Sequence, residues 1–402
     1  MNNITKQQLP LENVKVVDLT HAWAGPACSV LLGDMGADVI KVEPLAGDFY
    51  RVSMDGSLFV SINRNKRSIA LNLKIHEGLQ IILRLLKNAD VLIENFSPGT
   101  MDRIGLGYAE VSKVNPGIIY CSISGFGQNG PYRERRGYDP VAQAMSGIMI
   151  ATGEPGRPPV RILPAMIDYG AGIHAAYGIV TSLLARQESG RGERIDVSLL
   201  DVGINQMAPY ITHFSRTGEM PTRAGSGHMS WAPYQAFGTR DGYVLIAVTT
   251  EKMWKGLCEA LHLNHLGNDV RYSTLKGRVM HKNELVEEMG RMTKDYDSDA
   301  LEAKLLAAGI PCSKLMNVGE VIEDPHVQMR GLVEDVSYPG MGKIKVVRTP
   351  IHFSGGFPET RLKPPLLGQH TTEILREMGY SEQEIRRFIE GGIALQSEQE
   401  KT

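Results

Sequence analysis

Short apolar runs recur through the first half of the chain and alternate with longer helical patterns. The runs are rich in β-branched residues, and most are apolar on both faces over their central positions; they span residues 14–20, 38–43, 68–73, 90–96, 117–124 and 194–200. This pattern is typical of strands buried on both sides of a parallel sheet. Apolar residues at helical spacing lie between them, over residues 26–35, 77–88 and 169–186. The alternation predicts a doubly wound α/β domain.

The pattern changes after residues 217–224, TGEMPTRA, whose composition is typical of a linker. Residues 234–249 then contain two strand-like runs around an Asp-Gly turn, which predicts a β-hairpin. Helical patterns follow at residues 253–262, 283–292 and 299–308, and a last one at 371–378. We therefore expect a smaller α+β domain over residues 225–325.

Composition and charge narrow the classes of protein. The chain has 402 residues, 42% of them hydrophobic and 22% charged, which are ordinary values for a globular protein of more than one domain. A net charge of −2 gives no reason to expect nucleic acid or an anionic membrane as a partner. The sequence has no run of about 18 apolar residues, and its polar first residues lack a signal-peptide core. We expect a protein that does not span a membrane.

Cysteine usage points to a reducing compartment. The four cysteines are far apart and form no CxxC pair; they are Cys28, Cys121, Cys258 and Cys312. Neither a structural zinc site nor a disulfide framework is expected from this spacing. The sequence therefore predicts a cytoplasmic protein without a metal.

Residues 14–43 have the element order of a dinucleotide-binding unit, ending in an acidic residue, Glu43. A phosphate-binding turn of that kind carries GxGxxG, so that the backbone can approach the pyrophosphate. Here the turn reads HAWAGP, in which Gly25 is the only glycine and Pro26 starts the helix, where proline is favoured. The sequence also has no Walker loop. A nicotinamide-dependent oxidoreductase is therefore disfavoured, although it remains the rival from another class.

Nine segments, taken together and in order, resemble the class III CoA-transferases, the superfamily of formyl-CoA and carnitine CoA-transferases and of α-methylacyl-CoA racemase. They are HAWAGP (21–26), GADVIKVE (36–43), NKRSIALNLK (65–74), ADVLIENFSPGTMDRIGLGY (89–108), SGFGQNGPY (124–132), GYDPVAQAMSG (137–147), TGEPGRPP (152–159), PAMIDYGAGIH (164–174) and SGRGERIDVSLLD (189–201). Later matches lie at residues 308–326 and 364–375, so that the resemblance covers nearly the whole chain.

The resemblance implies an architecture that the pattern alone does not predict. In this family a large Rossmann-like domain is built from the N- and C-terminal parts of the chain, here residues 1–215 and 330–402. The small domain, residues 225–325, is inserted between them, and two subunits interlock as a homodimer.

Asp168 is the candidate catalytic residue. It lies between an apolar run and a long helical pattern, so we expect it at or just before a helix start, where the positive end of the helix dipole favours an ionised carboxylate. From its position alone, the better explanation of Asp168 is a helix N-cap. Gly170 and Gly172 are expected to let a bulky thioester approach the backbone. The resemblance implies that Asp168 is the nucleophile, which forms a mixed anhydride and then an aspartyl-CoA thioester.

The racemase branch of the superfamily is the alternative within the same fold. It needs two acid/base groups, a histidine and an aspartate, on opposite faces of the α-carbon. Tyr138 stands where that histidine would be, and an unperturbed tyrosine, with a pKa of about 10, is a poor base at neutral pH. The segment therefore favours the transferase.

The resemblance also assigns the residues that hold the CoA thioester, the only cofactor-like ligand expected. They are His21, Ala22, Leu71, Lys74, Asn95, Phe96, Arg103, Ile104, Arg136 and Tyr138. Without it, surface charge explains Lys74 and Arg103, and core packing explains Phe96. Tyr138, Gln143 and the loop Gly225-Ser226-Gly227-His228 are expected to shape the pocket, the loop as a lid.

Two departures from the family pattern affect the site. Pro44 replaces the basic residue that often follows the glutamate of the second strand, so that contact is either missing or made by Arg51. Trp23 lies at a variable position near the acyl group, where its indole either packs on the acyl chain or belongs to the helix-start core.

The sequence thus predicts an acyl-CoA:carboxylate CoA-transferase, with a small dicarboxylate such as succinate as one partner. The racemase, the oxidoreductase and a catalytically silent CoA-binding protein remain as alternatives.

Overall fold

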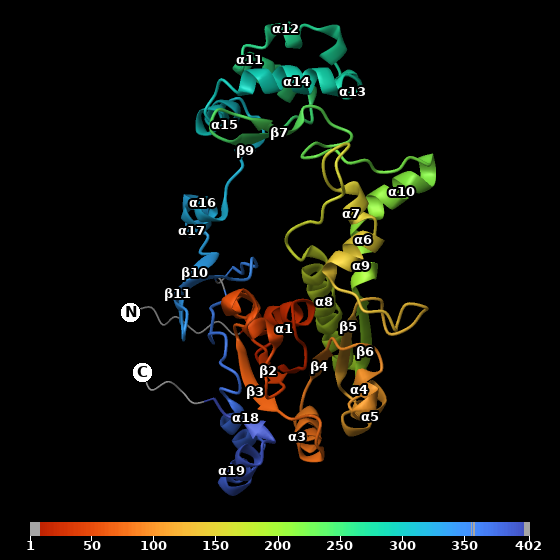
Figure 1. Ribbon diagram of the computed structural model, residues 1–402, viewed down its shortest axis with the longest axis vertical. Helices are drawn as coiled ribbons and strands as arrows, with labels where there is room; N and C mark the ends of the chain where they lie inside the picture. Colours follow the sequence, from red (N-terminus) through yellow and green to blue (C-terminus); the bar gives the residue numbers. More distant parts are fainter. Residues whose placement is uncertain (1–8, 355, 357, 398–402) are drawn as a thin grey trace. The chain divides into compact units, whose positions relative to one another are not determined.

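The computed structural model describes residues 9–354, 356 and 358–397 (Figure 1). By its internal contacts the chain divides into two compact units. The first comprises residues 1–148, 161–212 and 330–402, and the second comprises residues 149–160 and 213–329.

The first unit is built on a seven-stranded sheet of order β12-β3-β2-β1-β4-β5-β6. Its strands are β1 (Lys15–Asp18), β2 (Asp38–Glu43), β3 (Lys66–Leu71), β4 (Val91–Glu94), β5 (Ile119–Ser124), β6 (Glu193–Ser198) and β12 (Ala394–Leu395). All neighbours are parallel except β12, which pairs antiparallel with β3. The six strands predicted from the sequence are confirmed, and the α/β class with them. The strand order reverses between β1 and β4, which is where open α/β sheets bind ligands.

Helices cover both faces of this sheet. On one face β1–β5 form a hydrophobic core with α3 (His76–Leu86), α5 (Tyr108–Val114), α18 (Thr371–Glu377) and α19 (Glu382–Glu390). On the other face α1 (Ala24–Asp34) packs against α8 (Met166–Ser189). The remaining helices of this unit are α2 (Ser57–Ile62), α4 (Thr100–Arg103), α6 (Asp139–Met145) and α9 (Leu199–Gln206).

The C-terminal part of the chain adds elements that the sequence pattern did not predict. A two-stranded sheet, β10 (Val333–Tyr338) with β11 (Gly342–Val347), packs on Val60 of α2. Strand β12 was also missed, because two residues are too short for a period to show. Helix α19 was missed although Ile385, Phe388 and Ile389 follow helical spacing.

The second unit is a three-stranded antiparallel sheet covered by helices. Its strands are β7 (Tyr234–Gly238), β8 (Tyr243–Ala247) and β9 (Cys312–Lys314), and β7 and β8 form the predicted hairpin. Its helices include α11 (Glu251–Ala260), α12 (Asn264–Gly267), α13 (Leu275–Met280), α14 (Lys282–Thr293), α15 (Ser298–Ala307), α16 (Val318–Glu323) and α17 (Pro325–Met329). Two of the boundaries between the units fall within helices, α7 (Ile148–Ala151) and α10 (Ala208–Thr217). Within the described residues, no helix is long and apolar enough to cross a bilayer.

Candidate active site

A cavity of about 640 Å³ opens at the carboxyl ends of the central strands of the first unit. Its walls come from the ends of β1, β2 and β3, from the loop after β2, and from the segment after β4. The residues that line it are Leu19, Thr20, His21, Val42, Glu43, Pro44, Leu45, Ala46, Gly47, Asp48, Phe49, Leu71, Asn72, Leu73, Lys74, Phe96 and Ile104. Because the strand order reverses beside β1, this cavity lies where a doubly wound sheet is expected to bind its ligand.

The loop after β1 is fixed across the cavity by Asn95. The His21 backbone N–H donates to Asn95 Oδ1 at 3.0 Å, and Asn95 Nδ2 donates back to the His21 carbonyl at 2.8 Å. The His21 ring lies 5.3 Å from the Phe96 ring between centroids. The next residue, Ala22, has a φ of +63°, a left-handed conformation that an alanine adopts only when its surroundings enforce it.

The structure brings half of the predicted CoA contacts to this one cavity. His21, Leu71, Lys74, Phe96 and Ile104 line it, while Asn95 and Ala22 belong to the clamp beside it. Three predicted contacts do not line it. Arg103, on α4, is exposed and donates to the Thr100 hydroxyl, and Arg136 and Tyr138 are exposed residues that precede α6.

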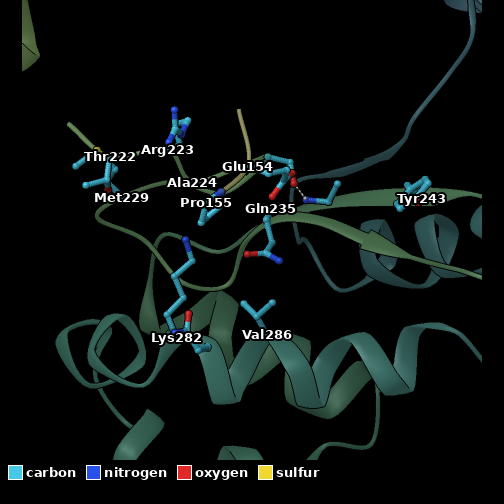
Figure 2. Close-up of a pocket in the computed structure, with 13 residues that line it drawn as sticks. Glu154, Pro155, Thr222, Arg223, Ala224, Met229, Gln235, Tyr243, Lys282 and Val286 are labelled. Carbon is cyan, nitrogen blue, oxygen red and sulfur yellow. Dashed lines mark hydrogen bonds between the residues drawn. The ribbon is translucent and has the colours of Figure 1, made fainter. Parts of the chain in front are cut away.

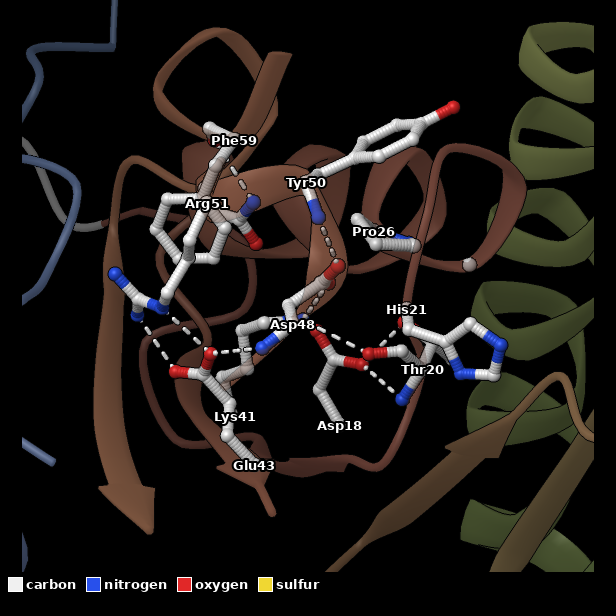
Figure 3. A network of polar contacts seen from close by, with 12 residues as sticks. Asp18, Thr20, His21, Pro26, Lys41, Glu43, Asp48, Tyr50, Arg51 and Phe59 are labelled. Carbon is white, nitrogen blue, oxygen red and sulfur yellow. Dashed lines mark hydrogen bonds and ion pairs between the residues drawn. The ribbon is translucent and has the colours of Figure 1, made fainter. Parts of the chain in front are cut away.

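A buried cluster of charged residues supports the floor of the cavity (Figure 3). Asp18 accepts hydrogen bonds from Thr20 and Ser29 and forms an ion pair with Lys66 at 3.2 Å. Lys41 donates to the Thr20 carbonyl at 2.8 Å and pairs with Asp48 at 3.1 Å. These contacts outweigh the cost of burial, so the pKa of the Asp18 carboxyl falls to about 2. The cluster holds the turn after β1 and the loop after β2 in one geometry.

Of the two alternatives for the basic adenine contact, the contacts of Arg51 favour the one in which that contact is missing. Its Nε and Nη2 both donate to the Glu43 carboxylate at 2.7 Å, and its Nη1 donates to the Pro365 carbonyl. Figure 3 shows its guanidinium over the Phe59 ring, 3.6 Å from the centroid. Every nitrogen that donates is therefore occupied within the protein. Glu43 is occupied in the same way, since it also accepts from Ser68 at 2.8 Å, which argues further against a ribose-binding role.

Asp168 lies in the first turn of α8 and is half buried. Its side chain does not cap the helix. The cap is provided by the buried Asp139, whose Oδ2 accepts from the backbone N–H groups of Ile167 at 2.8 Å and of Asp168 at 3.1 Å. Gln143 holds the other oxygen of Asp139 at 2.5 Å. With another carboxylate occupying the helix end, the side chain of Asp168 is left for chemistry.

The expectation that Asp168 stays fully ionised at neutral pH is wrong. Burial, and then the negative charge of Asp139, raise its pKa to about 7. The dipole of the helix end was expected to prevail, but it contributes only about 0.3–1 kcal/mol and already faces the Asp139 carboxylate. A carboxyl group with this pKa is only half ionised at neutral pH, and perturbation of this kind is typical of functional sites.

Gly170 and Gly172 serve helix packing, contrary to the expectation that they admit the thioester. A Cβ atom on Gly172 would lie 2.8 Å from Cβ of Ala27 and 3.0 Å from the carbonyl oxygen of Ala24, both on α1. A Cβ atom on Gly170 would lie 2.9 Å from Nε2 of Gln206 on α9. The two glycines therefore let α8 approach its neighbours and so fix where Asp168 stands.

The second unit contains a cavity of its own, about 620 Å³ in volume (Figure 2). Lys282 reaches into it from the start of α14 and donates to the His228 carbonyl at 3.0 Å. The glycine loop borders it: Ala224 and Ser226 line the cavity, and the Gly225 N–H donates to the Gly153 carbonyl at 2.9 Å. The role of this loop as a lid over Asp168 stays a prediction.

Comparison with known proteins agrees with this geometry. Residues 11–371 match the model of CoA-transferase family III. The chain is 37% identical to human succinyl-CoA:glutarate CoA-transferase, over 99% of this chain and 92% of that protein. It is 38% identical to an acyl-CoA transferase of Fusarium pseudograminearum, over 98% and 90%. The crystal structure of a CAIB/BAIF family protein from Brucella suis superposes with a TM-score of 0.85 and 36% identity, covering 92% of this chain and all of that one.

The chain therefore belongs to CoA-transferase family III, and it is a class III CoA-transferase that acts on CoA thioesters. The resemblance noted in the sequence is confirmed at the level of the family.

The sequence did not predict that Asp139 holds the start of α8, or that the loop after β2 forms a wall of the cavity. Asp139 was visible only as the residue next to Tyr138, and its signal was the Asp-Pro pair that opens α6. The loop residues, Pro44 to Phe49, carry no motif that would have placed them in a cavity wall.

Proposed function

We propose that this chain transfers CoA between two small dicarboxylic acids, one of them succinate, and that Asp168 is the covalent carrier. The observation that carries the proposal is the half-buried Asp168 carboxyl at the start of α8, held by Asp139 and raised in pKa to about 7. The family membership and the name of the human relative support the substrate class.

The reaction balances without water or an external proton donor. One oxygen of Asp168 attacks the thioester carbonyl carbon, the C–S bond breaks, and CoA leaves as a thiolate from a mixed anhydride. The thiolate then attacks the Asp168 carbonyl carbon, and the first acid leaves as its carboxylate. The acceptor carboxylate displaces CoA from the aspartyl thioester, and the thiolate finally attacks the acyl carbon of the acceptor to restore Asp168. Covalent catalysis of this kind divides a difficult displacement into easier steps.

The cavity of the first unit suits the CoA part of the substrate. Lys74 is exposed at its rim and offers an ammonium group for a phosphate, while Leu71, Phe96 and Ile104 supply apolar surface. The His21–Asn95 clamp fixes the backbone beside them. Arg103, Arg136 and Tyr138 remain proposed contacts of the same substrate.

We also propose that the protein is a homodimer. Apolar side chains at helical spacing form an exposed stripe on α8: Ile173, Tyr177, Val180 and Leu184, between 43% and 71% exposed. Helix α10 has no buried residue but exposes Tyr210, Ile211 and Phe214. An exposed apolar stripe such as the one on α8 is typical of a protein interface. Light scattering coupled to size exclusion tests it, and a monomer at micromolar concentration would contradict it.

Trapping of the intermediate tests the catalytic proposal. The enzyme is incubated with succinyl-CoA and then with hydroxylamine, which converts an activated aspartyl group into a hydroxamate that mass spectrometry locates. We expect the mark on Asp168, and Asp168→Ala without transfer activity. Exchange of solvent deuterium into the α-carbon of a chiral acyl-CoA would favour the racemase instead. Full transfer by Asp168→Ala would refute the proposal.

A further inference from the structure

A continuous series of rings leads away from the CoA cavity. Neighbouring centroids in the order Phe96, His21, Phe49, Tyr50, Trp23 are 5.3, 5.8, 4.9 and 6.3 Å apart. We call these five residues the aromatic row. The first three line the cavity, whereas Tyr50 and Trp23 do not. The aromatic row therefore continues past the space assigned to CoA.

The far end of the aromatic row lies close to the nucleophile. Burial, and then the negative charge of Asp168, raise the pKa of the Tyr50 hydroxyl. Trp23 immediately precedes α1, and Ala24 O lies 3.0 Å from where a Cβ on Gly172 would stand, one helical turn after Asp168. Tyr50 and Trp23 thus stand where the acyl group of a thioester bound in the cavity would meet Asp168.

Both residues carry a hydrogen-bond donor without a partner in the described part of the chain. The Trp23 indole Nε1 is buried and makes no hydrogen bond. The Tyr50 hydroxyl makes none either, and Figure 3 shows the Tyr50 ring directed away from the network around Lys41 and Asp48. A buried donor without an acceptor is costly, so the Trp23 N–H is suited to an acceptor that a ligand supplies. The Tyr50 side chain is only partly buried, and its O–H is available to the same acceptor.

Beside Asp168, neutral hydrogen-bond donors suit the binding of a substrate carboxylate better than a lysine or arginine would. Only burial and Asp139 shift the pKa of Asp168, and no lysine or arginine of the described residues counteracts them. A cation here would lower that pKa and weaken the carboxylate as a nucleophile. An indole N–H and a phenol O–H bind an anion without adding charge.

We propose that the Trp23 Nε1–H and the Tyr50 hydroxyl bind the distal carboxylate of a dicarboxylic acyl group and so select dicarboxylic over monocarboxylic substrates. This inference rests on the proposed function, since it assumes that Asp168 receives the acyl group. It assigns Trp23 to the substrate rather than to the helix-start core.

The test compares two thioesters that differ only at the far end of a five-carbon chain, glutaryl-CoA and pentanoyl-CoA. Enzyme in excess is mixed with each thioester, and release of the free acid is followed to give kcat/KM for the first half-reaction. Tyr50→Phe removes the hydroxyl donor and keeps the ring, and Trp23→Phe removes the indole N–H donor and keeps a smaller aromatic ring. Tyr380→Phe is the matched control, because this tyrosine packs on Phe388 at the periphery of the same unit.

We expect the kcat/KM of wild-type enzyme to be about 100-fold higher for glutaryl-CoA than for pentanoyl-CoA. Each variant should reduce this ratio about tenfold through a higher KM for glutaryl-CoA, because a hydrogen bond to a charged group is worth roughly a factor of ten in affinity. Rates with pentanoyl-CoA should stay within about twofold of wild type, and the control should match wild type on both. If Trp23→Phe does not fold, Tyr50→Phe alone decides.

An equal loss on both thioesters, or an unchanged preference, would overturn this inference while leaving Asp168 as the carrier. Wild-type enzyme that shows no preference would overturn it as well. If wild-type enzyme releases acid from neither thioester and gives no hydroxamate at Asp168, the proposed function itself is wrong. That result differs from the results above, which overturn only the roles of Trp23 and Tyr50.

Discussion

The Asp139 carboxylate accepts a hydrogen bond from the backbone N–H of Asp168, 3.1 Å from its Oδ2, so one carboxylate holds the helix start that carries the other. The same contact places a negative charge beside Asp168 and raises its pKa. Asp139 is a positioning residue in this arrangement, because it acts on the substrate only through Asp168.

Asp139→Asn separates these two effects. An asparagine oxygen still accepts from Ile167 and Asp168, although its amide nitrogen loses the hydrogen bond from Gln143. The negative charge is gone, so the pKa of Asp168 should fall by about 0.5–1 unit. The pH–rate profile of the first half-reaction should therefore move toward lower pH by that amount. Asp335→Asn, an exposed substitution on β10, is the control and should leave the profile unchanged. A profile that stays in place with a lower plateau would mean that Asp139 is only structural.

The wild-type pH dependence follows from the pKa of about 7 at Asp168. Only the ionised carboxylate attacks the thioester, so kcat/KM for acyl-CoA should rise tenfold per pH unit below about pH 7 and level off above it. Stopped-flow release of CoA thiol across the range from about pH 5 to 9 measures this. A rate that is already constant from about pH 5 upward would show that Asp168 has an ordinary carboxyl pKa.

The same pKa predicts that Asp168→Asn stabilises the fold while it abolishes transfer. The folded-state pKa is raised, so the folded protein resists ionisation that the unfolded chain accepts. The increase in the free energy of unfolding of Asp168→Asn should be small below about pH 4 and grow as the pH rises toward 7. Above about pH 7 it should reach about 1–2 kcal/mol, after allowance for the partial exposure of the side chain. Urea denaturation at low and high pH tests this. An equal gain at both extremes would attribute it to something other than charge.

The sequence predicted part of the fold and part of the candidate site, for different reasons in each case. The central strands and α8 followed from apolar periodicity, because each is long enough, or apolar enough on both faces, to be recognised locally. The β10–β11 pair depends on contacts with a distant segment, α2, which no local pattern encodes. Helix α19 did carry a local signal, the capping box of Ser381 and Glu384 before Ile385 and Phe388, and was overlooked.

The site shows the same division. The resemblance pointed to Asp168 and to five residues that the structure places around one cavity, since motif residues keep their order along the chain; their roles stay predictions. The occupation of Arg51 by Glu43 was not predictable, because it results from the folding of the loop after β2 over Phe59. The predicted ionisation of Asp168 was wrong for a related reason: its pKa depends on its burial in the folded chain and then on Asp139, 29 residues away in sequence.

Gly172 is predicted to be intolerant of even one added methyl group. A Cβ there would lie within 3.0 Å of the backbone of α1, at Ala24 O and Cys28 N, so α1 and α8 would have to separate. Gly172→Ala should destabilise the protein by about 1–3 kcal/mol and raise KM for acyl-CoA. Gly178→Ala is the matched control: its Cβ would meet only Ile195 at an ordinary 3.4 Å, so helix propensity should make it neutral or stabilising. Equal melting temperatures for the two variants would contradict this account of the packing.

The buried pair of Asp18 and Lys66 should dominate the acid stability of the first unit. The folded pKa of Asp18, about 2, lies below its unfolded value, so its contribution is present above about pH 4 and is lost as the pH falls toward 2. Asp18→Asn leaves Lys66 buried without its partner and should cost about 3–5 kcal/mol, whereas Asp18→Asn combined with Lys66→Met should recover most of that loss. Because the turn that carries His21 depends on this cluster, the single variant should also bind CoA more weakly, as isothermal titration would show. A single variant as stable as wild type at pH 7, with an unchanged acid transition, would mean that the pair contributes no net stability.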